Sequence, residues 1–218
     1  HKTIAIDLTG KFLTDDYRIR LSTNLELYWS EAFFTVNESK DVPHRLTRLR
    51  PESADLHHRG FSREYRVTSN GPFLRDYSSV STTPQWLPFE GMRTRFGDVT
   101  PLYQATDNQY VIFSSGEEVS MEFDATRLPL VPPGWTRDFV LHTDGWLKEG
   151  DLNTDTAATI APLPFHGMSS YPHDEVDTFP VSEQIQTYQN TYNTRWVSQN
   201  QYRDEIKSIG AALDSTDK

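Results

Sequence analysis

The sequence contains no cysteine. This absence excludes disulfide bonds, thiolate metal ligands, covalent attachment of c-type haem and cysteine nucleophiles together. It leaves the compartment open, because cytosolic proteins and exported proteins of this size both fold without disulfide bonds. Enzymes and metal sites that depend on thiolates are therefore not candidates for this chain.

Long apolar runs and positive charge are also scarce. No apolar run approaches the roughly 20 residues that a membrane-spanning helix needs. The 21 Lys and Arg residues face 31 Asp and Glu residues, which gives a net charge of −10. Because such a surface repels phosphate groups, we expect no nucleic-acid partner. Because no apolar run is long enough, we also expect no membrane span. With 218 residues, 36% of them hydrophobic, the chain suffices for one large domain or a domain with an appendage.

Alternation of apolar and polar residues predicts several short strands. Residues 4–8 alternate in this way, and residues 17–30 contain two alternating runs around a polar break, which predicts a hairpin. A second hairpin is predicted over residues 110–123, with its turn at Ser115-Gly116. Further strands are expected over 33–36, near 56–67 and over 135–142.

Helical spacing is confined to the end of the chain. A short helix is predicted over residues 182–189, and a second helical stripe is formed by Val197, Tyr202, Ile206, Ile209 and Leu213. No repeat of 20 to 50 residues is visible, which argues against a solenoid. The whole pattern predicts a mainly-β fold: a jelly-roll-like β-sandwich with long loops over residues 1–181, and a partly helical C-terminal extension over 182–218.

Several segments resemble one protein family when they are taken as a set. The strongest block is PPGWTRDFVLHTDGWLKEGDLN at residues 132–153. The set resembles the C-terminal region of exported bacterial proteins that carry FG-GAP propeller repeats with an ASPIC/UnbV segment, the cartilage acidic protein-like group, some with tetratricopeptide repeats. The other segments are IDLTGKF (6–12), RIRLSTNLELYW (18–29), GFSR (60–63), RFGDV (95–99), PLPFHGM (162–168) and YNTR (192–195).

The resemblance implies an accessory or adhesion-like module that is periplasmic, exposed on the cell surface or secreted. Its partner would be another protein or the remainder of its own parent chain. The first residue is His1, and no leader pattern follows it, so we expect a fragment or a processed chain. FG-GAP calcium loops and tetratricopeptide repeats are not recognisable, so the functions of a propeller are not carried over.

An acidic loop is the candidate metal site. Asp151, Asn153 and Asp155 alternate in the segment GDLNTD, and Asp144 lies shortly before them. Such hard oxygen ligands favour a calcium-like cation. The EF-hand pattern is not met, because the sixth and twelfth positions from Asp151 hold Thr and Pro instead of Gly and Glu. The competing interpretation is a solvated loop that uses Asp and Asn for turn geometry.

Aromatic residues are the candidate contacts for a ligand or partner. Trp86, Trp135 and Trp146 lie beside prolines or glycines, outside the clearest strand patterns. In such loops a tryptophan can serve as a platform for a sugar or a protein. The alternative is that the three rings cap the ends of a sandwich.

Histidine and methionine side chains can also serve as ligands of a metal ion or haem. His142, His166 and His173 form no short-range metal motif, and we interpret them as structural. Met168 is the candidate axial ligand of a non-covalent b-type haem. Its competing role is to fill an apolar gap.

No enzyme motif is found in the sequence. The nucleophile motif GxSxG is missing, and the carboxylate pairs Asp15-Asp16 and Glu117-Glu118 are expected in turns. Glycosidase carboxylates instead face each other across about 5 to 9.5 Å. We therefore expect a non-catalytic interaction or assembly module of an exported bacterial protein. The alternative is a ligand-binding sandwich for carbohydrate, a calcium-like cation or b-type haem. The sequence assigns no cofactor with certainty, and calcium is the candidate.

Overall fold

The chain divides into two compact units, residues 1–43 and 44–218. A computed structural model describes most of both units. The first unit contains no helix or strand among its described residues, so the strands predicted over 4–8 and 33–36, and the first strand of the hairpin over 17–30, are wrong there. Within this unit the Phe12 ring packs edge-on against Tyr17, with 5.1 Å between the ring centroids. The described residues are 4–22, 31–36, 43–84, 87–148, 150, 156–174 and 176–200.

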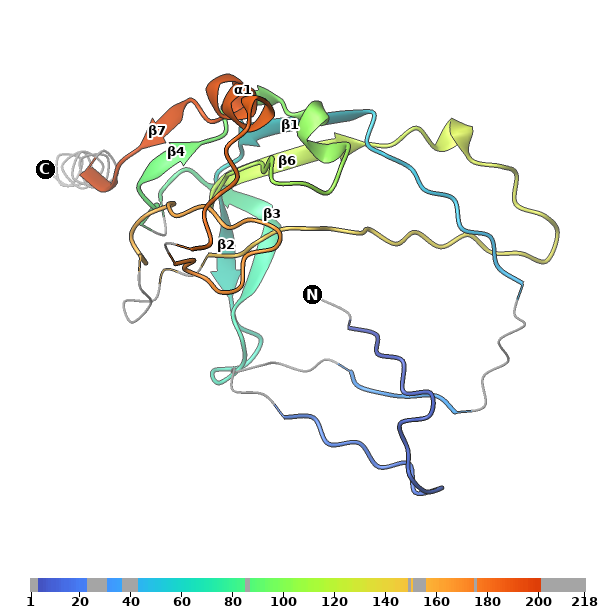
Figure 1. The fold of residues 1–218 in the computed structure, drawn as a ribbon. Coiled ribbons are helices and arrows are strands. Elements are labelled where there is room, and N and C mark those ends of the chain that lie inside the picture. Colours follow the sequence, from blue (N-terminus) through green and yellow to red (C-terminus); the bar gives the residue numbers. More distant parts are fainter. Residues whose placement is uncertain are drawn as a thin grey trace, which may run out of the picture. The chain divides into compact units, whose positions relative to one another are not determined.

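A three-stranded antiparallel sheet forms the centre of the second unit (Figure 1). Its middle strand β1 (Ser53–His58) lies between β5 (Gly97–Asp98) and β6 (Glu117–Glu122). Alternation along β1 turns Ala54 and Leu56 inward, where both are buried. The core that they form with other segments consists of Ala54, Leu56, Val99, Leu102 and Tyr188.

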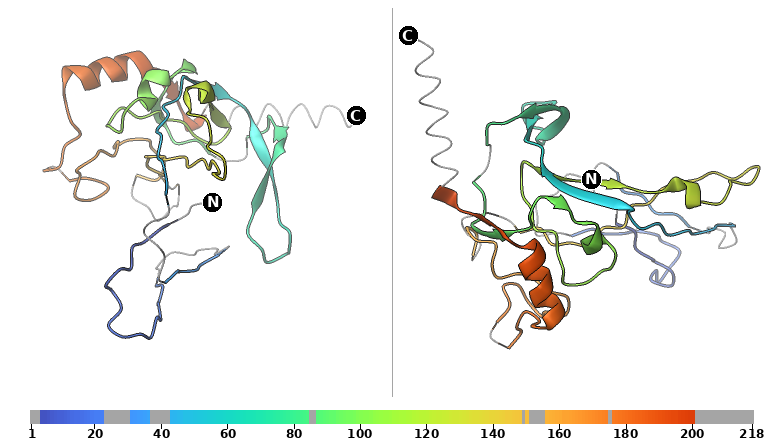
Figure 2. Two further views of the ribbon diagram at one scale, coloured as in Figure 1. Left: turned by 90° about the vertical axis from the view of Figure 1, so that its right-hand side faces the viewer. Right: turned by 90° about the horizontal axis from the view of Figure 1, so that it is seen from above.

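The other elements surround this sheet in small groups. The regular elements of the described residues are seven strands, one α-helix and two short 3-10 helices, which confirms a mainly-β fold. Figure 2 shows the β2–β3 hairpin extending away from α1. The sheets are small and separate, and they do not close into a sandwich in the described part of the chain. The remaining elements are β2 (Phe61–Tyr65), β3 (Leu74–Ser81), β4 (Gly91–Arg93), β7 (Arg195–Val197), the 3-10 helices η1 (Thr100–Tyr103) and η2 (Ala125–Arg127), and α1 (Glu183–Tyr192).

The turn before β6 is at the predicted position, Ser115-Gly116. Gly116 has a φ of +87°, and a Cβ atom there would lie 2.9 Å from the Phe61 ring. Glycine is therefore required both by the backbone conformation and by the close approach. The residues before the turn form no strand; instead Ile112 N donates to Thr94 Oγ1 at 2.7 Å.

Helix α1 confirms the predicted short helix near residues 182–189. The Ser182 hydroxyl accepts from Ile185 N at 3.2 Å and so caps the helix. The helix buries Tyr188, whose hydroxyl donates to Tyr110 O at 2.6 Å and accepts from Asn193 Nδ2 at 2.9 Å.

The predicted C-terminal helical stripe is wrong at its first residue. Val197 lies in strand β7, which pairs antiparallel with β4 (Gly91 opposite Val197). Pairing with a neighbouring strand therefore overrides the local helical spacing at this position. The rest of the stripe lies in residues 201–218, outside the described residues.

A buried charge cluster joins β4, β6 and β7. Glu117 Oε1 accepts from Arg93 Nη1 at 3.2 Å and from Arg195 Nη1 at 2.6 Å, and Glu117 Oε2 accepts from Ser114 N at 3.0 Å. The side chains of Arg93 and Glu117 are 4% and 6% exposed. Burial lowers the pKa of the Arg93 guanidinium, and the negative charge of Glu117 opposes that shift. The expected placement of Glu117 in a turn is therefore wrong, since it is an internal counter-charge at the start of β6.

Replacing the buried carboxylate should destabilise the fold strongly. Glu117→Gln keeps the size of the side chain but leaves two guanidinium groups without their counter-charge, so we expect a loss of about 3 to 5 kcal/mol in the free energy of unfolding. Urea denaturation measures it. The control is Glu118→Gln, whose carboxylate is 43% exposed, and it should cost under about 1 kcal/mol. Equal midpoints for the two variants would contradict the role given to Glu117.

Tyr188 should make stability depend on alkaline pH. Burial raises the pKa of Tyr188 to about 12, above its ordinary value of 10. Between these values the unfolded chain loses the phenol proton first, so the stability contributed by neutral Tyr188 is present below pH 10 and is lost as pH rises towards 12. The difference in unfolding free energy between wild type and Tyr188→Phe should therefore shrink over this range, with Tyr192→Phe as control. A constant difference would refute this expectation.

Candidate functional site

Three loops bring a polar and aromatic cluster together in the second unit. Asp144, predicted as a metal ligand, lies beside His166. Trp146, predicted as a partner contact, donates a hydrogen bond to Tyr110 in the same cluster. Asn108 and Tyr110 complete the cluster from the segment before β6. No member lies on a strand or helix, so side-chain bonds between the loops hold the group together.

His166 is held on both sides of its ring. Its Nε2 lies 3.2 Å from Asp144 Oδ2, and its Nδ1 lies 3.0 Å from Asn108 Oδ1. The backbone N of His166 also donates to Asn108 Oδ1, at 2.8 Å. Since a general base needs a nitrogen that can face a substrate, this arrangement suits positioning better than proton transfer.

Trp146 is fixed at its nitrogen and open on its ring. The indole Nε1 donates to the Tyr110 hydroxyl at 3.2 Å, while half of the residue, 50%, remains exposed. The Tyr110 ring stacks on His166, with 6.1 Å between centroids. Burial raises the pKa of Tyr110 and the hydrogen bond from Trp146 opposes that shift, so at neutral pH the phenol is protonated. The cluster therefore presents an aromatic surface in a defined orientation.

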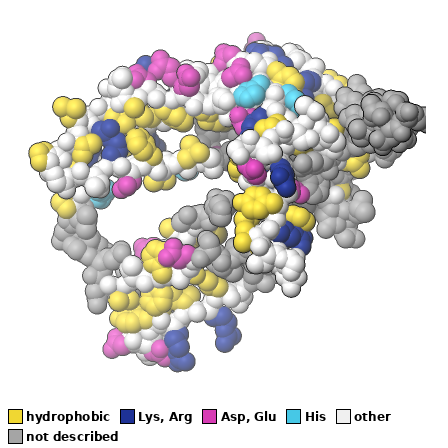
Figure 3. Space-filling model, turned by 180° about the vertical axis from the view of Figure 1, so that it is seen from behind, with side chains coloured by type: hydrophobic (Ala, Val, Ile, Leu, Met, Phe, Trp, Pro, Cys, Tyr) yellow, Lys and Arg dark blue, Asp and Glu magenta, His cyan; other side chains and the backbone are white. Residues whose placement is uncertain are grey.

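An exposed apolar arm, residues 135–147, leads into this cluster. Phe139 is 75% exposed, Val140 91% and Leu147 97%. Among the described residues, the arm's one backbone–backbone hydrogen bond joins Trp135 N to Pro132 O at 3.1 Å. The strand predicted over 135–142 is therefore not formed: the segment forms no ladder with a described strand (Figure 1). Hydrophobic side chains gather on this part of the surface (Figure 3, upper left).

The other predicted site residues are not brought into this cluster. Trp86, Asp151, Asn153 and Asp155 lie outside the described residues, so the calcium site stays a prediction. Trp135 is 42% exposed at the start of the arm. Within the described ranges, no group of three His, Asp or Glu side chains is arranged to hold a metal ion.

The candidate haem ligand lies in a short turn. Met168 N donates to Phe165 O at 3.4 Å, and Met168 is half-buried. His173 packs edge-on against the Phe165 ring, with 5.3 Å between centroids. Both arrangements agree with local packing roles, and the haem ligand stays a prediction.

Asn108 and Tyr110 are the site residues that the sequence did not reveal. Their partner His166 is 58 residues from Asn108 and 56 from Tyr110 along the chain. No spacing rule for strands or helices relates positions so far apart. Their one local signal is a polar segment, Asp107-Asn108-Gln109, immediately before an apolar run.

Comparison with known proteins yields no match to a family model, a curated protein or a solved structure. None of the helices in the described ranges has the length and apolar character needed to cross a bilayer.

The hydrogen bond between Trp146 and Tyr110 should be visible by nuclear magnetic resonance. Tyr110→Phe removes the acceptor, so the indole N–H signal of Trp146 should shift and exchange faster with water. Trp146→Phe identifies that signal by its loss. Tyr103→Phe is the control and should leave the signal in place. An unchanged Trp146 signal in Tyr110→Phe would show that the hydrogen bond is not formed.

Proposed function

We propose that this chain is a non-catalytic interaction module that binds a protein partner along the apolar arm. The observation that carries the proposal is the exposure of adjacent aliphatic and aromatic side chains from Phe139 to Leu141, and of Leu147. Burial of each such side chain is worth about 1.5 to 3 kcal/mol. Contiguous apolar surface of this kind marks interaction sites on proteins.

The backbone of the arm supports binding by strand addition. From residue 136 to 147 its N–H and C=O groups form no backbone–backbone hydrogen bond with other described residues. An added strand would satisfy these groups, while alternation places Phe139 and Leu141 on one face and Val140 on the other. The jelly-roll-like sandwich expected from the sequence would then be completed by strands of the partner.

Bonds at both ends orient the arm before binding. The Arg137 side chain donates to Pro129 O near the start. At the other end Asp144 contacts His166, and Trp146 donates to Tyr110. A segment that is already oriented loses less conformational freedom on association, which strengthens binding.

The resemblance described above supports the setting of this proposal. We place the module in an exported bacterial protein, in the periplasm, on the cell surface or secreted. Its partner is then the remainder of the parent chain or a second protein of the same compartment.

Carbohydrate binding is the second candidate function, and one observation favours it. The half-exposed Trp146 ring is fixed to the Tyr110 hydroxyl, in the same cluster as the side-chain oxygens of Asp144 and Asn108. Sugars bind to an aromatic face through their C–H groups and to such oxygens through their hydroxyls. Under this function Trp146→Ala should abolish sugar binding, and substitutions at Phe139 should not.

Without its partner the arm should cause self-association, because backbone N–H and C=O groups that lack a partner can pair with those of a second copy of the chain. We expect the sedimentation coefficient of the wild type to rise with concentration, and that of Phe139→Lys/Leu141→Lys to stay constant. The matched control is Val67→Lys/Val176→Lys, since both valines are highly exposed outside the arm. This control should associate like the wild type. Association that survives in the arm variant would refute the proposal.

A further inference from the structure

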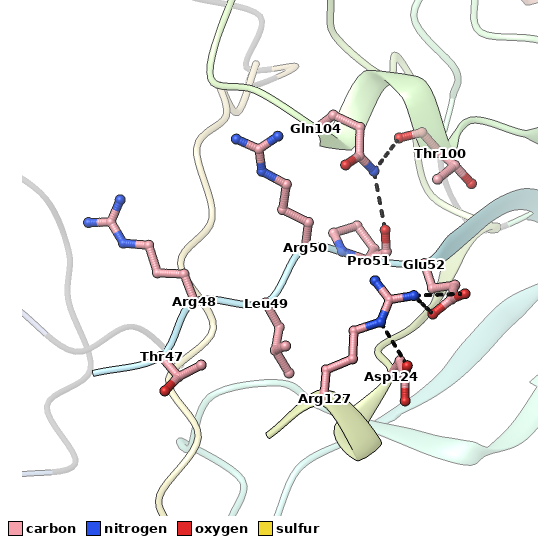
Figure 4. Close-up of a pocket in the computed structure, with 10 residues that line it drawn as sticks. All are labelled: Thr47, Arg48, Leu49, Arg50, Pro51, Glu52, Thr100, Gln104, Asp124 and Arg127. Atoms are coloured by element: carbon pink, nitrogen blue, oxygen red, sulfur yellow. Dashed lines mark hydrogen bonds and ion pairs between the residues drawn. The ribbon is translucent and has the colours of Figure 1, made fainter. Parts of the chain in front are cut away.

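A second candidate site lies at the N-terminal end of β1, and none of its lining residues belongs to the arm. A cavity of about 700 Å³ is bounded there by the segment that enters β1 and by residues of η1 and near η2 (Figure 4). Its volume lies within the range of ligand sites in proteins. The segment contributes residues 47–52, and the other lining residues are Thr100, Gln104, Asp124 and Arg127.

The charges around this cavity do not cancel. Arg127 is neutralised, because its Nη2 lies 3.3 Å from Glu52 and its Nε lies 2.9 Å from Asp124. Arg48 and Arg50 form no ion pair with any residue that the structure describes, and both are exposed. The lining thus carries three guanidinium groups and two carboxylates, a net charge of +1 in a chain whose net charge is −10, and Arg48 and Arg50 are its guanidinium groups without an ion pair to a described residue.

The two free guanidinium groups lie on the same side of an extended segment. Figure 4 shows Arg48 and Arg50 projecting together, with Leu49 between them pointing the opposite way. Alternate residues of an extended chain are roughly 6.6 Å apart. Carboxylates at alternate positions of a second extended chain have the same spacing. Each guanidinium group can therefore bind one carboxylate through two parallel N–H···O hydrogen bonds.

The backbone of this segment is also open. Residues 45–50 make no backbone–backbone hydrogen bond with a described residue. The nearest such bond joins Glu52 N to Glu122 O at 2.8 Å and continues the β1–β6 ladder by one position. The chain before Pro51 is therefore extended and close to a sheet, with its backbone groups free of backbone–backbone hydrogen bonds to described residues, whereas Pro51 O accepts from Gln104 Nε2 at 3.2 Å.

We propose that residues 47–50 bind an extended acidic peptide with carboxylates at alternate positions. Its carboxylates pair with Arg48 and Arg50, and its backbone pairs with the open segment, as in other cases of strand addition. A lone phosphate would use the charges but not the unpaired backbone, so the peptide is favoured. This site shares no residue with the arm and does not depend on the function proposed for it.

Fluorescence anisotropy with two labelled peptides tests the proposal. One peptide alternates Glu and Thr over eight residues, and the other has the same composition with its four Glu residues contiguous. The alternating peptide should bind wild type more tightly than its isomer. Arg48→Glu/Arg50→Glu should weaken this binding about tenfold or more. The matched control, Arg20→Glu/Arg63→Glu, has the same net charge and reverses two exposed arginines elsewhere; it should bind like wild type.

Each remaining outcome would overturn the proposal. Equal binding of the two peptides, or displacement by inorganic phosphate at concentrations similar to that of the peptide, would mean a site for small anions only. Equal weakening in the control variant would mean a general charge effect. Absence of binding to wild type would exclude the site. Thermal unfolding verifies the fold of both variants, and Arg48→Gln/Arg50→Gln replaces the charge reversal if that variant unfolds.

Discussion

One buried carboxylate is the constraint on which the second unit depends. Glu117 holds guanidinium groups from β4 and β7, and it also accepts from the backbone of the preceding turn. Strands of three residues, such as β4 and β7, have too few ladder bonds to be stable alone. The charge cluster therefore supplies the link that the small sheets lack. It continues to the core through Thr94 and Asn193, which bonds the Tyr188 hydroxyl.

The distribution of apolar residues agrees with a role in recognition. Among the described residues the buried core cluster contains five members, while large side chains along the arm are exposed to water. A chain whose only task was to fold would bury these groups, since hydrophobic burial is the main stabilising contribution to folding. Retaining them on the surface is understandable if another chain covers them.

Periodicity predicted some elements that find a partner in the fold and failed for segments that find none. The alternation near Leu56 lies in β1, and the turn at Gly116 and the helix near Ser182 were expected. Residues 4–8 alternate equally well but form no strand, because alternation shows which face is apolar and not whether a neighbouring strand exists. The contacts of Glu117 and His166 join distant parts of the chain, so no local pattern could reveal them.

The turn at Gly116 connects two parts of the second unit mechanically. Arg59 N and Gly60 N both donate to Gly116 O at 2.9 Å, and the Phe61 ring lies against Gly116. The β2–β3 hairpin thus begins at the same joint that positions Glu117 one residue later. The position of this hairpin and the geometry of the charge cluster are therefore set by the same turn, through contacts at neighbouring residues.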